Sequence, residues 1–330
     1  MSYISDFFGM IFDWINGLTN NYGLSIVIFT ILFRLVLSPL DIRSRIGQRE
    51  YTAKLKKIQP EIDNINKAYK NDPQKAQQRM MEVRKKNGIG MMPKGCGTML
   101  LTYPILIAFF AVFRNLAAEH MYELSRLSTE SDIANWFSTN GFLWVKNIWQ
   151  PDVYFNFSEV WGTRTLWIIK NIDGYIIPQA NNVAAMLQST FKNTFSNFGD
   201  FETFQAFADS VSAGLEPARE FVKTHFATGG AVGGNGFYIL PLLAGAVQLL
   251  SLKGQQNQQP ASTDPTMQQA AGTGKFMKIF FPLMFVYFCL VSSTALAIYW
   301  ITSSLCMLLL NFIINKVLDA REAKKGEIEQ

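Results

Sequence analysis

The sequence predicts an all-α polytopic membrane protein with five transmembrane helices. Apolar residues make up 49% of the 330 residues and concentrate in five blocks. These blocks contain no Asp or Glu, and they are separated by segments rich in charge or in polar residues. Blocks of this kind, about 16–23 residues long, fit the hydrocarbon thickness of a bilayer. We expect spans at 24–40, 98–116, 237–252, 276–291 and 295–317.

The first element, residues 1–20, is expected to be an amphipathic helix. Phe8, Ile11, Ile15 and Leu18 recur on one helical face, and Asp13 falls on the other. This pattern favours a helix that lies in the membrane interface. The same pattern also suits an ordinary amphipathic helix packed on protein.

The charge of the connecting segments predicts the orientation of the spans. Residues 41–96 carry fourteen Lys and Arg against six Asp and Glu, whereas residues 118–236 carry seven against twelve. Because positive residues near span ends stay in the cytoplasm, we expect 41–96 inside and 118–236 outside. The N-terminus is then outside. The linker 253–275 and the tail 318–330 are cytoplasmic.

The cytoplasmic segment 41–96 is expected to form a helical hairpin. Asp72 and Pro73 are a helix-start signal, and Asn87-Gly88 is a stop signal. The basic surface would suit anionic headgroups, although a purely structural, solvated hairpin explains the same sequence.

Arg34 lies within the first span, and no span supplies a carboxylate to pair with it. A charge at such a position faces a wet cavity or snorkels to the interface. The cavity is favoured by polar residues in the spans, namely Thr30, Tyr103, Gln248 and Trp300. A cationic groove of this kind would attract acidic segments of another molecule.

Several long motifs occur in an order that resembles one family. They are "NYGLSIVIFTILFRLVLSPL", "KKIQPEIDNINKAYKNDPQKAQQ", "GCGTMLLTYPILIAFFAVF", "GFYILPLLAGAVQLL" and "FFPLMFVYFCLVSSTALAIYWITSSL". Together they resemble the YidC family of membrane protein insertases, in its Gram-positive-like form with five core spans. The resemblance implies a hydrophilic groove that is open to the cytoplasm and to lipid and closed to the outside.

The resemblance also implies an activity, a location and site residues. The activity is insertion and folding of client transmembrane segments in the bacterial cytoplasmic membrane, alone or with the Sec translocon. Further implied partners are nascent membrane proteins, the lipid bilayer and the ribosome, the last through the hairpin and tail. By position, the residues that resemble the family's groove are Arg34, Thr30, Gln248, Trp300, Tyr103, Phe285 and Phe288.

One segment departs from the family pattern. Residues 154–236 stand where relatives run almost directly from the outside loop into the third span. Phe201, Phe204 and Phe207 recur at helical spacing, and "ATGGAVGGNG" after them reads as a flexible tether. The segment would lie on the outer membrane face or bind a partner, or it is a spacer without a task.

Other functional classes are less well supported. A small-solute or ion transporter is the alternative, but it predicts paired charges or inverted repeats in the spans. An enzyme would need an acid pair, a dyad or a metal cluster. The spans contain no acid or histidine, and the cysteines lack metal-ligand spacing. We therefore expect no enzyme activity, cofactor or metal, and no recognition of nucleic-acid sequence.

Overall fold

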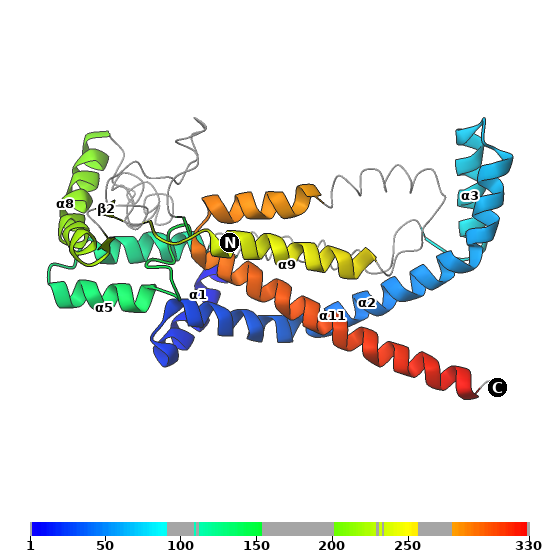
Figure 1. The fold of residues 1–330 in the computed structure, drawn as a ribbon, viewed down its shortest axis with the longest axis horizontal. Coiled ribbons are helices and arrows are strands. Elements are labelled where there is room, and N and C mark those ends of the chain that lie inside the picture. The colour runs from blue at the N-terminus through cyan, green and yellow to red at the C-terminus, as the bar shows by residue number, and fades with distance from the viewer. Residues whose placement is uncertain are drawn as a thin grey trace. The chain divides into compact units, whose positions relative to one another are not determined.

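The computed structural model describes most of the chain, and its described part is helical apart from one short β-hairpin (Figure 1). The described residues are 2–90, 109, 112–153, 201–228, 231–232, 234–256 and 279–328. Much of the predicted second span, 98–116, falls outside them, as do most of the linker 253–275 and residues 154–200 of the insertion. The all-α class is confirmed, whereas the groove and the five-span arrangement stay predictions.

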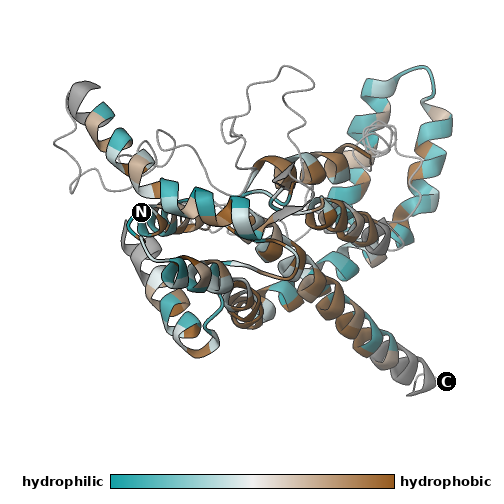
Figure 2. Ribbon diagram, turned by 60° about the vertical axis from the view of Figure 1, so that its left-hand side comes forward, coloured by the Kyte–Doolittle hydropathy of each residue, from teal (hydrophilic) through white to brown (hydrophobic). Residues whose placement is uncertain are grey.

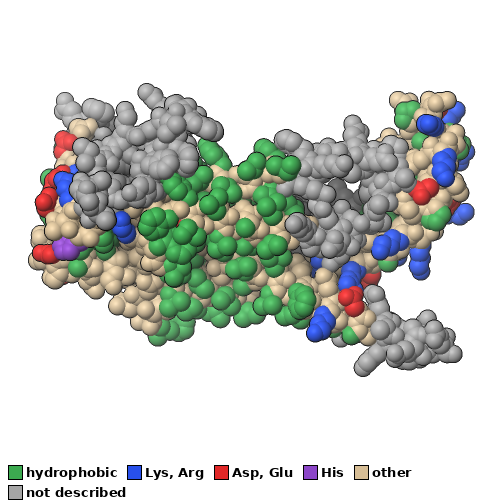
Figure 3. Space-filling view, in the orientation of Figure 1, with side chains coloured by type: hydrophobic (Ala, Val, Ile, Leu, Met, Phe, Trp, Pro, Cys, Tyr) green, Lys and Arg blue, Asp and Glu red, His purple; other side chains and the backbone are tan. Residues whose placement is uncertain are grey.

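Among the described residues, two helices are long and apolar enough to cross a membrane, Tyr22–Ala68 and Thr294–Ala320. Two shorter apolar helices cover Ile239–Leu252 and Ile279–Val291. Side chains exposed on these shorter helices include Leu242, Leu249, Leu283 and Tyr287. The space-filling view shows green hydrophobic side chains gathered over them, with few charges between (Figure 3). Apolar side chains exposed along a helix in this way are suited to contact with lipid.

The chain divides into two compact units. Unit 1 contains residues 1–32, 105–245 and 285–303, and unit 2 contains residues 33–104, 246–284 and 304–330.

Unit 1 has an aromatic core to which four helical segments contribute. Phe109 stacks on Phe8 of α1 (Ser2–Thr19), with ring centroids 5.3 Å apart, and on Tyr299 of α11 (Thr294–Ile328) at 4.6 Å. Phe29 of α2 (Tyr22–Ala68) meets Phe109 edge-on at 5.7 Å. Aromatic pairs in these geometries add stability beyond the area they bury. The core fixes the first turns of α2 against the start of α11.

Helix α1 uses part of its apolar face for packing within unit 1. Phe12 and Ile15 are buried, while Met10, Trp14 and Leu18 remain exposed. The helix therefore packs on protein and still presents apolar side chains outward. Its place at the membrane interface stays a prediction.

The predicted helix of the insertion forms and packs on the rest of unit 1. Helix α8 (Phe201–His225) lies beside α5 (Glu130–Asn140): Phe221 stacks on Phe137 at 5.6 Å, and His225 lies 3.2 Å from Glu130. Gly214 faces the Ser125 carbonyl so closely that a side chain there would clash. This part of the insertion is thus integral to the fold of unit 1.

The glycines of the "ATGGAVGGNG" segment suggest a flexible tether, and its described residues also make defined contacts. Strands β1 (Ala227–Thr228) and β2 (Ala231–Val232) pair in an antiparallel hairpin. Asn235 is fully buried, and its hydrogen bonds are described below. The flexibility of the segment stays a prediction.

Helix α2 continues without a break from the predicted first span into the segment 41–68, through Pro39 and Pro60. A proline inside a helix leaves the carbonyl four residues earlier without its N–H donor. For Pro39 that carbonyl belongs to Leu35, and the Ser38 hydroxyl donates to it at 2.7 Å. The local replacement lets α2 remain helical across the position expected to end the span.

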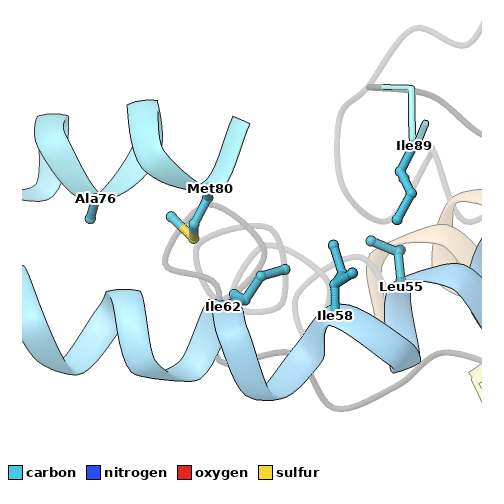
Figure 4. Packing of buried hydrophobic residues seen from close by; sticks show 6 residues of the cluster. All are labelled: Leu55, Ile58, Ile62, Ala76, Met80 and Ile89. Atoms are coloured by element: carbon cyan, nitrogen blue, oxygen red, sulfur yellow. The ribbon is translucent and has the colours of Figure 1, made fainter. Parts of the chain in front are cut away.

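In unit 2, α2 and α3 (Pro73–Lys86) are joined by a short turn and form a helical hairpin within the expected segment 41–96. Asp72 caps α3 by accepting from the Lys75 N–H at 3.1 Å, and Gly88 adopts a positive φ after the last turn. Figure 2 shows α3 as largely hydrophilic. The two helices share a small core that Figure 4 draws: Leu55, Ile58, Ile62, Ala76, Met80 and Ile89.

The end of α11 also belongs to unit 2. Its residues 318–328 are helical, so the described part of the predicted tail extends the fifth span as one helix. Asp319 of this extension pairs with Arg49 of α2 at 2.7 Å.

Candidate functional site

Arg34 has a counterion within its own chain. Its Nη1 lies 4.0 Å from Oδ2 of Asp41, two turns further along α2, and both side chains are about one-fifth exposed. The spans contain no carboxylate, but Asp41 begins the next segment and is a counterion within the chain. Pairing of Arg34 with an acidic segment of another molecule stays a prediction.

The Arg34–Asp41 pair is loose. A nitrogen–oxygen distance of 4.0 Å is too long for a hydrogen bond, and Oδ2 of Asp41 is buried without a hydrogen-bond partner. Burial raises the pKa of Asp41, and the Arg34 guanidinium lowers it by a smaller amount. The carboxylate balances charge on α2, and its own Oδ2 remains without a hydrogen bond.

Arg45 follows Asp41 by one turn and is 7% exposed. Its Nε atom is buried without a hydrogen-bond partner, and within the described residues it has no ion pair. Burial lowers the pKa of Arg45, and the nearby Arg49 cation lowers it further. A buried, unpaired guanidinium is costly, so this position stands out in unit 2.

Three of the predicted groove residues come together in unit 1. Phe285 contacts the Trp300 ring at 4.4 Å between centroids, and Phe288 contacts it at 6.5 Å. The first contact is edge-on, the arrangement that aromatic quadrupoles favour. The helix Ile279–Val291 and α11 thus present one aromatic cluster.

The other predicted residues are less informative. Thr30 is fully buried, and its hydroxyl donates to the Ile26 carbonyl at 2.6 Å within α2. Gln248 is half-buried on α9 (Ile239–Gln256). Tyr103 lies outside the described residues. Whether these three line a common groove with Arg34 and Trp300 stays a prediction.

A second polar site, which the sequence reasoning missed, lies in unit 1 around the loop 145–153. Asp152 is fully buried and accepts from the Phe237 and Leu240 N–H groups, both at 2.7 Å, and from Trp144 Nε1 at 3.2 Å. Because Leu240 is in the first turn of α9, the carboxylate caps that helix. The sequence around Asp152 gives no capping signal, because the helix that Asp152 caps begins more than eighty residues later in the chain.

Asn235 completes this site. Its Nδ2 donates to the carbonyls of Asn147, Gln150 and Pro151, and its Oδ1 accepts from the Asn147 N–H at 2.8 Å. Thr294, at the start of α11, donates its N–H and its hydroxyl to the Gln150 carbonyl. The loop therefore ties the beginnings of α9 and α11 together. We call these residues the 145–153 network: Asn147, Gln150, Asp152, Asn235 and Thr294.

A cavity of about 670 Å³ opens between α5, α8 and the turn at residues 141–146. Its lining includes the aromatic residues Phe137, Phe142, Phe221 and Phe226, and it also includes Lys146. Lys146 donates to the Gly234 carbonyl at 3.0 Å and lies over the Phe226 ring, and burial lowers its pKa. None of the predicted groove residues lines this cavity.

The model of the family described as 60Kd inner membrane protein matches residues 14–207 and 186–322, so it covers nearly the whole of α2, α9 and α11. The chain belongs to this family. Its YidC-type relatives include two from Clostridium perfringens and Clostridium tetani, each named membrane protein insertase YidC and each 36% identical over 45% of this chain. A namesake from Leptospira interrogans is 36% identical over 40% of this chain.

The match to these YidC proteins is partial in length. It covers 57% and 59% of the clostridial relatives and 18% of the Leptospira relative. The recognised family resemblance is confirmed. The activity of the whole protein is therefore taken up as a proposal.

Proposed function

We propose that this protein inserts client transmembrane segments into a bacterial cytoplasmic membrane. The observation that carries the proposal is Arg34, a partly buried cation on an apolar helix of a YidC-family chain, held by a loose counterion. A charged side chain in the middle of a bilayer costs about 2.5–3.5 kcal/mol on insertion scales. An acidic residue in the translocated tail of a client incurs this cost when it crosses the bilayer. A cation partway across lowers that cost.

The client's acidic tail pairs with Arg34 while its apolar helix passes along neighbouring spans. The Phe285–Phe288–Trp300 cluster supplies an apolar contact for that helix. The client then leaves sideways into lipid, driven by burial of its own apolar residues. Work with the Sec translocon and contact with the ribosome through α3 and the tail belong to the same proposal.

Insertion of matched clients into vesicles tests the role of Arg34. Arg34→Ala and Arg34→Glu should slow insertion of a single-span client with two Asp in its translocated tail, by at least about fivefold, the factor that 1 kcal/mol represents. Arg34→Lys should retain part of the activity, because charge is the proposed requirement. A client with Asn at both positions should respond little. Arg43→Ala is the control, since Arg43 is exposed on the same helix. Equal insertion by all variants would refute the role.

Labelling of single cysteines tests the proposed orientation. With Cys96, Cys289 and Cys306 replaced, a cysteine at the exposed Ala206 of α8 should react with a membrane-impermeant maleimide added to cells. A cysteine at the exposed Lys85 of α3 should react only after the cells are opened. The reverse pattern would overturn the positive-inside assignment.

A further inference from the structure

Arg34, Asp41 and Arg45 lie on one face of α2. Asp41 follows Arg34 by seven residues, and Arg45 follows Arg34 by eleven. Each of these steps turns an α-helix to within about 20° of its starting direction. By helix rise, Asp41 lies about 10 Å beyond Arg34 and about 6 Å before Arg45. All three belong to unit 2. We call them the charged stripe.

The single carboxylate of the charged stripe has a cation on each side. It pairs loosely with Arg34, at 4.0 Å, and its Oδ2 makes no hydrogen bond although it is buried. On the other side, Arg45 is nine-tenths buried, and its Nε has no hydrogen-bond partner. The next cation, Arg49, is already occupied by Asp319 at 2.7 Å. The stripe thus carries two arginines and one carboxylate, a net charge of one.

A net charge of one leaves room for one further carboxylate. While that acid is absent, Asp41 has Arg34 as its partner and Arg45 has none. When an acid arrives at Arg34, two carboxylates would compete for one guanidinium unless Asp41 takes another partner. Arg45, one turn away in the i,i+4 relation that allows side chains to meet on a helix, is the cation without one.

We propose that Asp41 is a resident counterion that moves from Arg34 to Arg45 when the acidic residue of a client binds Arg34. This inference rests on the proposed function and assigns two residues to it. Of the three residues in the stripe, only Arg34 touches the client. Asp41 and Arg45 act through Arg34 and are positioning residues. The exchange involves no proton or bond: one ion pair is replaced by two. Clients with a neutral tail leave Asp41 in place, so the exchange favours acidic tails.

The test compares five variants on two clients in vesicles. The clients differ only by one Asp or one Asn in the translocated tail. Arg45→Gln should slow the Asp client by about fivefold, the factor that 1 kcal/mol represents, because Asp41 then has no second partner. Asp41→Asn combined with Arg45→Gln should restore insertion of that client, because the competing carboxylate is gone. Arg45→Lys should also restore it, and Arg43→Gln is the exposed control.

The rescue by the double variant is what a purely structural role of Arg45 would not produce. If Arg45 instead bound a lipid phosphate or the client directly, the double variant would remain as slow as Arg45→Gln. Equal slowing of both clients would also overturn the exchange. If Arg34→Ala has no effect on the Asp client, the proposed function itself fails. If Arg34→Ala slows that client and Arg45→Gln does not, the exchange alone fails.

Discussion

The 145–153 network and the charged stripe both bury polar groups, and they treat them in opposite ways. In the network, Asp152 accepts three hydrogen bonds and Asn235 takes part in four. In the stripe, buried atoms of Asp41 and Arg45 have no hydrogen-bond partner. Saturated networks rigidify a structure, whereas an unsatisfied buried polar group carries a cost, and a functional role is one explanation for it. The difference separates a part of the chain that holds its shape from one poised to receive a charge.

Loss of the Asp152 carboxylate is expected to have the largest effect on stability. Asp152→Ala leaves the Phe237 and Leu240 N–H groups and the Trp144 indole without their acceptor. Hydrogen bonds to a charged group contribute about 1.5–3 kcal/mol each, so we expect destabilisation of about 3 kcal/mol or more. Thermal unfolding in detergent measures it. Asp209→Ala, an exposed site on α8, should change stability little. Equal destabilisation by Asp152→Ala and Asp209→Ala would show that the buried carboxylate contributes no more to stability than an exposed one.

The next effect should come from Asn235. Asn235→Ala removes its hydrogen bonds to four backbone groups, which we expect to cost about 2–3 kcal/mol. Asn235→Asp should cost more than Asn235→Ala, because a carboxylate would face the three carbonyls that Nδ2 now contacts. The exposed Asn135→Ala is the control. Chemical unfolding of the purified protein gives the order, and a milder effect of Asp than of Ala would contradict the assigned orientation of the amide.

The contrast also explains what the sequence could and could not predict. The start of α3 at Asp72-Pro73 and its end at Asn87-Gly88 are local signals, and both were predicted. The continuity of α2 through Pro39 depends on one hydroxyl, Ser38, whose rotamer no pattern reveals. The 145–153 network was missed because its partners lie more than eighty residues apart in sequence. Trp300 belongs to unit 1, whereas Arg34 and Gln248 belong to unit 2. A groove lined by all three residues therefore stays a prediction.

Removal of the Arg45 charge should have the opposite sign from changes in the network. Arg45→Met replaces a buried, unpaired guanidinium by an apolar side chain of similar length, which we expect to be neutral or to stabilise by about 1 kcal/mol. Arg49→Met is the matched comparison: it breaks the pair with the exposed Asp319 and should destabilise by less than about 1 kcal/mol. Thermal unfolding of both variants decides the matter. A large loss for Arg45→Met would show that its charge is already satisfied.

The smallest effect concerns acid stability in unit 1, where Glu123 lies 3.1 Å from His120. The hydrogen bond with His120 lowers the pKa of Glu123, more than partial burial raises it. A carboxyl whose folded pKa is depressed contributes stability above its unfolded pKa, about 4.3, and that contribution is lost as pH falls through the folded value. Because the Glu123 side chain is more than half exposed, we expect less than about 1 kcal/mol.

Comparison of unfolding midpoints at pH 7 and pH 3.5 isolates this contribution. The unmodified protein should lose slightly more stability over the interval than Glu123→Gln, whose side chain cannot titrate. Glu61→Gln, at an exposed position of α2, should behave like the unmodified protein. If Glu123→Gln loses as much stability as the unmodified protein, the His120–Glu123 contact is a surface pair with no thermodynamic weight. The hydrogen-bonded polar groups that stabilise unit 1 would then be the neutral side chains and Asp152 alone.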